Sequence, residues 1–239
     1  MHGLVPVTAC CHHAYHDDVM TLDRLLSAIS DPSAPLITYY DISSGERIEL
    51  SGTTTANWVA KTSNLLVDDL DAEPGTRIRI GLPTHWQSIV WLLAAWNVGA
   101  AVVDRAADIG VSGPELVADE PVKLAASLRP LGGPFATAPT GFSDLALEVP
   151  GHGDHFEAFD PPTADTVAVD LAGTVVTHAE LASQATPDPR RLLVEPGSTT
   201  RDAHLIVSAC TGGGSVVVVA SATPDALVRI AAQEGAFAG

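Results

Sequence analysis

The densest group of potential metal ligands in this sequence lies near its N-terminus. Cys10, Cys11, His12, His13 and His16 supply thiol and imidazole groups, the ligand types that zinc and nickel sites use. The usual Cys-x2-Cys spacing is missing, and adjacent ligands strain a closed tetrahedral site. We therefore treat these five residues as candidate metal ligands, with adventitious metal binding as the favoured alternative.

A second group of ionisable residues lies in a glycine-flanked segment. His152 and His155 are three residues apart, with Asp154 and Glu157 beside them. Two histidines at this spacing could bind a metal ion or act as acid and base near neutral pH. The alternative, which we favour, is a solvated linker loop, because loops concentrate polar residues for solubility as well as for function.

Residues 165–182, DTVAVDLAGTVVTHAELA, resemble the segment around the ATP loop of the adenylate-forming enzymes, the superfamily of acyl-CoA synthetases and AMP-binding ligases. In that family a strand leads into the loop T-S-G-T-T-G-x-P-K-G, then into an apolar pair, then into Thr-His at the start of a helix. Here the strand TVAVD and the tail VVTHAEL are present, but Leu171, Ala172 and Gly173 occupy the place of the loop. The resemblance implies a family member that has lost its phosphate-binding loop.

The loop matters because ATP carries several negative charges on its phosphates. Glycine-rich backbone lets consecutive N–H groups converge on the phosphate oxygens, hydroxyl groups add donors, and a lysine adds positive charge. The link Leu-Ala-Gly has one glycine, no hydroxyl and no cation, so we expect that it cannot enclose a triphosphate. Lys61 and Lys123 are the chain's lysines, whereas the resemblance implies adenylation by a lysine of a C-terminal domain.

Two further segments match parts of the family pattern. Thr177 and His178 match the Thr-His after the loop, and we treat them as candidate ligand-binding residues that could face a surviving cleft. A capping box, with Thr177 as N-cap and Glu180 three residues later, explains Thr177 equally well. Residues 51–55, SGTTT, match the first letters of the phosphate loop, but their position before a long apolar pattern favours a helix N-cap at Ser51.

Hydrophobic periodicity predicts the elements that carry these segments. It indicates a helix from Met20 to residue 29, a hairpin over 36–50, a helix from Ser51 to about residue 70, a strand over 76–83, a helix over 85–98 and a strand over 100–103. After an irregular stretch, in which we expect a strand at 115–119 and a short helix at 121–128, strands and helices alternate again from residue 166. They include a helix that begins at Asp202 and ends at the glycines 212–214, and a last helix with Thr223 as N-cap and Pro224 at its first position. Alternating elements with nearly continuous Val, Ala and Leu strands predict an α/β fold of mostly parallel sheets flanked by helices. The order of elements over 34–103 also resembles the N-terminal domain of the adenylate-forming enzymes.

We expect three parts in the chain. Residues 1–19 lack periodicity and read as a disordered extension or as sequence upstream of a true start at Met20. Residues 20–150 form a first α/β subdomain with an irregular linker at its end, and residues 151–239 form a second, truncated one. In the family a segment like the last one continues into the motifs that hold the nucleotide, so its end at residue 239 is a further reason to expect no complete reaction.

Composition limits the classes of partner. A formal charge of −17 repels nucleic acid and anionic membranes. The N-terminus lacks the pattern of a signal peptide, and three cysteines make no disulfide framework, so we expect a cytoplasmic protein.

The function that we expect is that of a non-catalytic relative of the AMP-binding enzymes, without a cofactor. It would act as a binder of an unknown small molecule or as a protein-interaction module. The alternatives are an enzyme that uses the residual cleft, half of a split adenylate-forming ligase, or a metal-responsive module built on the N-terminal cluster. An open sheet edge left by truncation would also favour a homo-oligomer or a protein partner that covers it.

Overall fold

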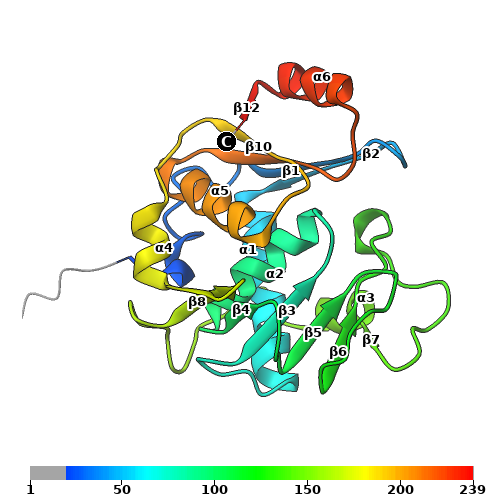
Figure 1. Cartoon of the computed structure of the whole chain (residues 1–239), viewed down its shortest axis with the longest axis vertical. Coiled ribbons are helices and arrows are strands. Elements are labelled where there is room, and N and C mark those ends of the chain that lie inside the picture. The colour runs from blue at the N-terminus through cyan, green and yellow to red at the C-terminus, as the bar shows by residue number, and fades with distance from the viewer. Residues whose placement is uncertain (1–19, 239) are drawn as a thin grey trace, which may run out of the picture.

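Two β-sheets enclose a layer of helices in this protein (Figure 1). The computed structural model describes residues 20–238. The five-stranded sheet, at the top of Figure 1, has the order β12-β10-β11-β1-β2. Its strands are β1 (Pro35–Asp41), β2 (Glu46–Ser51), β10 (Arg191–Val194), β11 (Ser215–Val219) and β12 (Ala236–Ala238).

The seven-stranded sheet, at the bottom of Figure 1, has the order β7-β6-β5-β3-β4-β8-β9. Its strands are β3 (Arg77–Gly81), β4 (Ala101–Val103), β5 (Ile109–Ser112), β6 (Val122–Ala125), β7 (Ser143–Asp144), β8 (Val167–Leu171) and β9 (Thr174–Thr177). Paired strands in both sheets are parallel, apart from the antiparallel pairs β1–β2 and β8–β9. The prediction of a mostly parallel α/β fold is confirmed.

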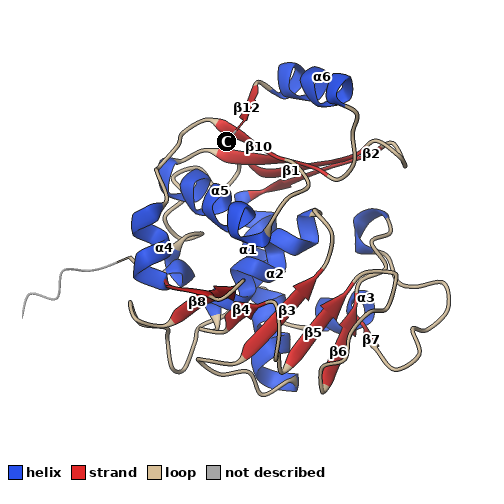
Figure 2. Cartoon of the chain, in the orientation of Figure 1, coloured by secondary structure: helices blue, strands red, loops and turns tan. Residues whose placement is uncertain are grey.

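Three of the helices fill the space between the sheets (Figure 2). They are α1 (Gly52–Asn64), which continues into the π-helical turn η2 (Leu65–Asp69), α2 (Trp86–Asn97) and α5 (Thr199–Gly212). The others are α3 (Leu145–Glu148), α4 (His178–Gln184), α6 (Pro224–Glu234) on the outer side of the upper sheet, and the 3-10 helices η1 (Leu22–Arg24), η3 (Pro130–Gly132) and η4 (Val149–Gly151). None of the helices within residues 20–238 is long and apolar enough to cross a membrane.

Helix α2 forms the centre of the core because almost its whole surface is apolar. Nine of its residues are buried, from Trp86 to Trp96. Trp96 is fully buried, and its indole Nε1 donates a hydrogen bond to the Ala168 carbonyl on β8 at 3.1 Å. A helix that is apolar on all sides needs cover on all sides, which the two sheets and the neighbouring helices supply.

Several helix ends lie where the sequence predicts them. The Ser51 hydroxyl accepts a hydrogen bond from the Thr54 amide at 3.1 Å, which confirms an N-cap at the start of α1. Thr223 caps α6, with Pro224 in its first turn. Gly213 ends α5 in the left-handed conformation, with φ of 73°, where glycine has no steric penalty. Local capping signals thus fix these boundaries.

Three of the predicted elements are wrong. Residues 20–29 form only η1 and hydrogen-bonded turns, although Leu22 and Leu25 are buried as the apolar pattern requires. Residues 115–119 form no strand, and 121–128 contain β6 in place of a helix. Short apolar runs fit both periodicities, and pairing of β6 with β5 and β7 decides between them. The β5 strand that makes this pairing possible has no counterpart among the predicted elements.

The expected boundary at residue 150 does not coincide with the boundary between the sheets. Strands β1 and β2 join the upper sheet from the N-terminal side of this point, and β8 and β9 join the lower sheet from its C-terminal side. The division of the chain into domains stays a prediction. Residues 1–19, the expected extension, lie outside the described residues.

Candidate functional site

The place of the expected phosphate loop is a two-residue turn between β8 and β9. Leu171, at the end of β8, pairs with Thr174, at the start of β9, so only Ala172 and Gly173 connect the strands. Both have positive φ angles, 52° for Ala172 and 80° for Gly173, the pattern of a type I′ hairpin turn. The backbone reverses its direction at once and leaves no loop that could surround a phosphate group.

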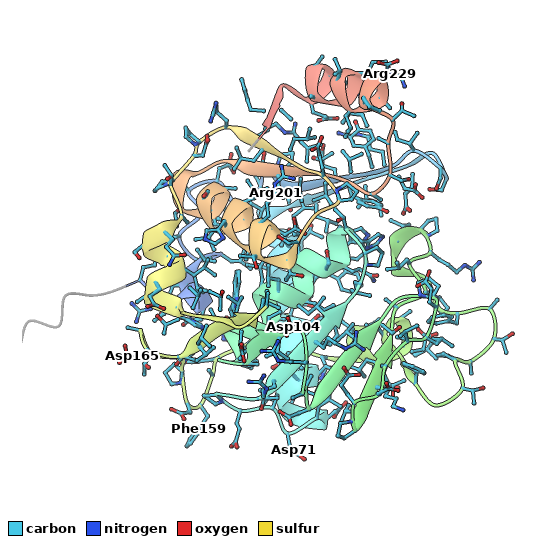
Figure 3. All side chains as sticks on the ribbon, viewed as in Figure 1. Asp71, Asp104, Phe159, Asp165, Arg201 and Arg229 are labelled. Carbon is cyan, nitrogen blue, oxygen red and sulfur yellow. The ribbon has the colours of Figure 1, made fainter. Side chains whose placement is uncertain are left out.

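The polar groups beside this turn bind one another. Asp104, labelled beside the lower sheet in Figure 3, accepts a hydrogen bond from the Ala172 amide at 2.7 Å through Oδ2. Its Oδ1 lies 3.2 Å from Arg105 Nη1. On β8, Asp170 Oδ2 lies 3.1 Å from Arg77 Nη2. Both of these arginine charges are thus paired with carboxylates of the chain itself.

Thr177 and His178, the candidate ligand-binding pair, connect β9 to α4. The Thr177 hydroxyl accepts a hydrogen bond from the Glu180 amide at 3.2 Å, and the Glu180 carboxylate accepts one from the Thr177 amide at 2.9 Å. The predicted capping box is confirmed.

His178 is fully buried, and its Nδ1 accepts a hydrogen bond from the Leu22 amide at 3.2 Å. Burial lowers the pKa of His178 to about 4, so its ring is neutral near neutral pH. Its contacts hold η1 against α4. A ligand role for Thr177 and His178 stays a prediction, and the geometry assigns both of them structural contacts.

The loop that contains His152 and His155 is held against the C-terminal end of α1. Lys61 Nζ donates a hydrogen bond to the His152 carbonyl at 2.5 Å and lies 2.8 Å from Asp154 Oδ1. Asn64 Nδ2 donates a hydrogen bond to the His155 carbonyl at 2.9 Å. The loop is therefore an anchored connection between α1 and the chain that leads to β8.

In residues 20–238, no three His, Cys, Asp or Glu side chains are grouped in a way that could hold a metal ion. The other candidate metal ligands, Cys10, Cys11, His12, His13 and His16, lie outside the described residues. Cys210, which does lie within them, is a buried free thiol. Its burial raises its pKa to about 12, which makes it a poor nucleophile.

A cavity of about 260 Å³ lies where the two sheets approach each other. Its wall comes from the end of β3, the first half of α2, the loop from β10 into α5, and the residue after β11. The apolar part of the wall includes Ile80, Leu82, Ile89 and Leu92. Because β3, β10 and β11 are parallel to their neighbours, their carboxyl ends meet here, the usual position of ligand sites in open α/β sheets.

Among the residues that the structure describes, Asp202 is the only ionisable one in the wall of this cavity. It lies in the first part of α5, next to Arg201, which Figure 3 labels between the two sheets. The residue is only 9% exposed, and its Oδ1 has no hydrogen-bond partner within residues 20–238. Burial raises the pKa of Asp202 to about 6, against a smaller lowering by the charge of Arg201. The carboxyl group of Asp202 is therefore the group in this cavity that a ligand could bind through charge.

Sequence reasoning misses Asp202 because it places the start of the helix too late. The predicted helix begins at Asp202 itself, where an acidic residue is ordinary, whereas α5 begins at Thr199 with Ser198 as its N-cap. The Ser198 hydroxyl accepts a hydrogen bond from the Arg201 amide at 3.3 Å. Ser198 followed by a helical pattern is the signal that could have placed Asp202 one turn inside the helix, on the side that the core covers.

A larger hollow, of about 520 Å³, lies beside η2 and the chain at 156–160. Phe159 on its rim is fully exposed, and the carboxylates of Asp68, Glu73 and Glu157 in its wall belong to exposed residues. Water solvates such groups, so they need no ligand. The smaller cavity, with its buried carboxyl group, is therefore the candidate ligand site.

Comparison with known proteins supports the fold. A Brucella canis acyl-CoA synthetase matches 91% of this chain with a TM-score of 0.74 at 14% identity, and the match covers 46% of that protein. An acetoacetyl-CoA synthetase from Streptomyces lividans matches 91% of the chain with a TM-score of 0.72 at 19% identity, over 41% of its own length. The chain has the α/β fold of the acyl-CoA synthetases, over less than half of their length. The predicted resemblance to adenylate-forming enzymes is confirmed at this level.

A sequence relative also exists. The TIGR03089 family protein of Mycobacterium tuberculosis (strain ATCC 25618 / H37Rv) is 45% identical over 145 residues, which are 56% of this chain and 59% of that protein. No family model matches the sequence. This chain thus spans little more than half of its curated relative and less than half of the two synthetases.

Proposed function

We propose that this chain is a non-catalytic relative of the adenylate-forming enzymes that binds a small molecule between its two sheets. The observation that carries the proposal is the two-residue turn at Ala172 and Gly173. Adenylate formation needs a group of N–H donors and a cation around a triphosphate. Two residues with hairpin geometry cannot supply that group, and the arginines beside the turn already have carboxylate partners.

The binding site that we propose is the cavity beside α5. Its volume of about 260 Å³ is slightly below the range of about 300 to 1,000 Å³ that is usual for drug-sized ligands, so the ligand is small. The wall combines apolar side chains with the hydroxyl groups of Thr84, Ser88 and Thr199 and the buried carboxyl group of Asp202, and such a mixture can orient a small ligand. The fold supplies the position, and the ligand does not need the nucleotide chemistry of the family.

Titration of the purified chain with magnesium-ATP, AMP, coenzyme A and a panel of small metabolites tests this proposal. We expect no binding of magnesium-ATP at millimolar concentration, no exchange of pyrophosphate into ATP, and stabilisation by a small ligand. A ligand at a hundred times its dissociation constant raises the free energy of unfolding by about 2.7 kcal/mol.

Two variants locate the site of binding. Ala220→Phe fills the cavity, because Ala220 lies in its wall, and should abolish stabilisation by the small ligand. Ala232→Phe places the same ring on the exposed face of α6 and should leave stabilisation by the small ligand unchanged. The proposal would be contradicted if the parent chain bound magnesium-ATP tightly and if inserting residues into the β8–β9 turn abolished this binding.

A further inference from the structure

The position of Asp202 is unfavourable for the folded chain on its own. An ionised carboxyl group at 9% exposure has lost most of its hydration, and its Oδ1 gains no hydrogen bond in return. Carboxylates that are buried in proteins normally bind N–H groups, cations or metal ions. Arg201, the preceding residue on the same helix, acts on Asp202 through its charge.

The residues around Asp202 limit which kind of molecule could pair with its carboxylate. Leu82, Ile89 and Leu92 present apolar surface to the same cavity, and the Ser88 hydroxyl already donates a hydrogen bond to the His85 carbonyl at 2.6 Å within the cap of α2. The hydroxyl groups of Thr84 and Thr199 also belong to the wall. A partner with a hydrogen-bond donor at one end and an apolar part at the other fits both the carboxylate and the apolar side chains. A cation is favoured over a neutral donor, because it also compensates the charge of the buried carboxylate.

We propose that Asp202 anchors a small primary amine, whose ammonium group donates a hydrogen bond to the carboxylate while its alkyl part lies against Ile80, Leu82 and Ile89. This inference rests on the proposed function, since it names the chemical class of ligand for the same cavity. The ammonium charge compensates the buried carboxylate, and the alkyl part removes apolar surface of the wall from water.

The dependence of binding on pH separates this ligand class from others. Asp202 is the ionisable group in the wall that β3, α2, α5 and the end of β11 form, and Arg201 is the charged neighbour that acts on it. A primary amine stays protonated up to about pH 10, as lysine does. Amine binding therefore strengthens as the pH rises through about 6, where Asp202 ionises. A carboxylic acid should show the opposite trend, because two ionised carboxylates repel each other.

The test uses three probes of similar shape, 1-butylamine, 1-butanol and butanoate, with the whole chain in calorimetric and thermal-shift titrations. At about pH 7.5 we expect butylamine to bind about 10-fold or more tightly than butanol. Lowering the pH to about 5 should remove most of this preference, as the carboxyl group becomes protonated. This pH series uses the parent chain, so it tests the amine proposal even if a substitution impairs folding.

Asp202→Asn should abolish the preference for butylamine and leave the affinity for butanol within about twofold. Asp225→Asn, a matched change at an exposed position in the first turn of α6, should leave all three affinities unchanged. Equal or tighter binding of butanol or butanoate would overturn the amine proposal and leave the proposed function intact. Binding of none of the three, together with no effect of Ala220→Phe on any ligand, would overturn both.

Discussion

The β8–β9 hairpin and the cavity beside α5 differ in how completely the chain satisfies its own polar groups. At the hairpin, the Ala172 amide has a carboxylate acceptor, Asp170 has an arginine partner, and Thr177 and Glu180 cap each other. At the cavity, Asp202 is more deeply buried than these groups, and its Oδ1 has no partner within residues 20–238. The polar groups of the turn and its capping box are thus paired within the chain. Among residues 20–238, buried side-chain atoms without a partner include Oδ1 of Asp202 at the cavity and, just after β9, Nε2 of His178.

This difference indicates where function can reside in the chain. A region whose donors and acceptors are all paired has little to offer a ligand, because binding there must first break internal bonds. A buried group without a partner destabilises the protein until a ligand supplies one, so it couples stability to binding. Removing a paired buried group should therefore lower the free energy of unfolding, whereas neutralising the unpaired carboxylate of Asp202 should raise it.

The largest effect that we expect comes from His178, which joins the end of the hairpin to η1. His178→Ala removes a fully buried ring and leaves the Leu22 amide without its acceptor. We expect the free energy of unfolding to fall by about 3 kcal/mol near neutral pH. Urea denaturation followed by tryptophan fluorescence measures it, and His155→Ala, at an exposed position, is the matched control.

The effect of His178→Ala should also depend on pH. The pKa of His178 is lowered to about 4 in the folded chain, below its ordinary value of 6.5. Between these values the unfolded chain binds more protons, so the contribution of His178 is complete above about pH 6.5 and is lost as the pH falls toward 4. The difference between the parent and His178→Ala should shrink over this window. A difference that stays constant from pH 7 to about pH 4 would contradict the neutral, buried state of the ring.

Asp202→Asn should have the opposite sign. Because burial raises the pKa of Asp202 to about 6, the ionised group destabilises the folded chain at neutral pH. We expect the variant to be more stable than the parent by about 2 kcal/mol at pH 7.5. The gain should disappear as the pH falls through 6 toward 4, where the parent carboxyl group is protonated as well.

Thermal and urea denaturation of the parent, Asp202→Asn and Asp225→Asn at several pH values check this prediction. Asp225 lies in the first turn of α6 and is exposed, so its replacement should change stability by less than about 0.5 kcal/mol. Loss of stability in Asp202→Asn at pH 7.5 would mean that the aspartate makes a favourable internal contact, and the contrast between the two regions would fail.

The sequence predicts those parts of the fold whose signals are local. The β1–β2 hairpin, the N-caps at Ser51 and Thr223 and the glycine that ends α5 each depend on a few adjacent residues, and each is confirmed. Strands β5 and β6 are missed because short parallel strands lack an alternating pattern when both faces are covered. Only pairing with distant neighbours distinguishes them from helices or loops.

The β8–β9 hairpin and the cavity beside α5 also differ in how far the sequence alone reveals them. The loss of the phosphate loop is visible from Leu171, Ala172 and Gly173 alone, because a deletion changes spacing along the chain. The state of Asp202 depends on β3, α2 and β11, which approach α5 only in the folded protein. No local pattern reveals that the carboxyl group at this position is buried in the wall of a cavity and that its Oδ1 has no donor within residues 20–238.

A smaller effect tests whether the hairpin turn is as constrained as its geometry indicates. Gly173 has a φ of 80°, and a Cβ atom added there would have nothing within 4 Å. The cost of Gly173→Ala is therefore conformational, about 1 kcal/mol, since side chains disfavour the left-handed region. Gly151→Ala is the control, because Gly151 also has open space around it and is not among the glycines with positive φ. Equal effects of the two substitutions in urea denaturation would refute the turn assignment.

The smallest effect concerns Ala172, the other central residue of the turn, and it should be a gain. Ala172 has a φ of 52°, which alanine adopts poorly, whereas asparagine adopts it readily and Asn-Gly is the preferred pair for a type I′ turn. Ala172→Asn should raise the free energy of unfolding by about 0.5 kcal/mol, with the amide bond to Asp104 retained. The same variant should gain no affinity for magnesium-ATP, because it strengthens a hairpin and does not restore a loop. Stabilisation without nucleotide binding would support a purely structural role for this turn. Increased ATP binding would instead show that the turn can still rearrange to contact a phosphate group.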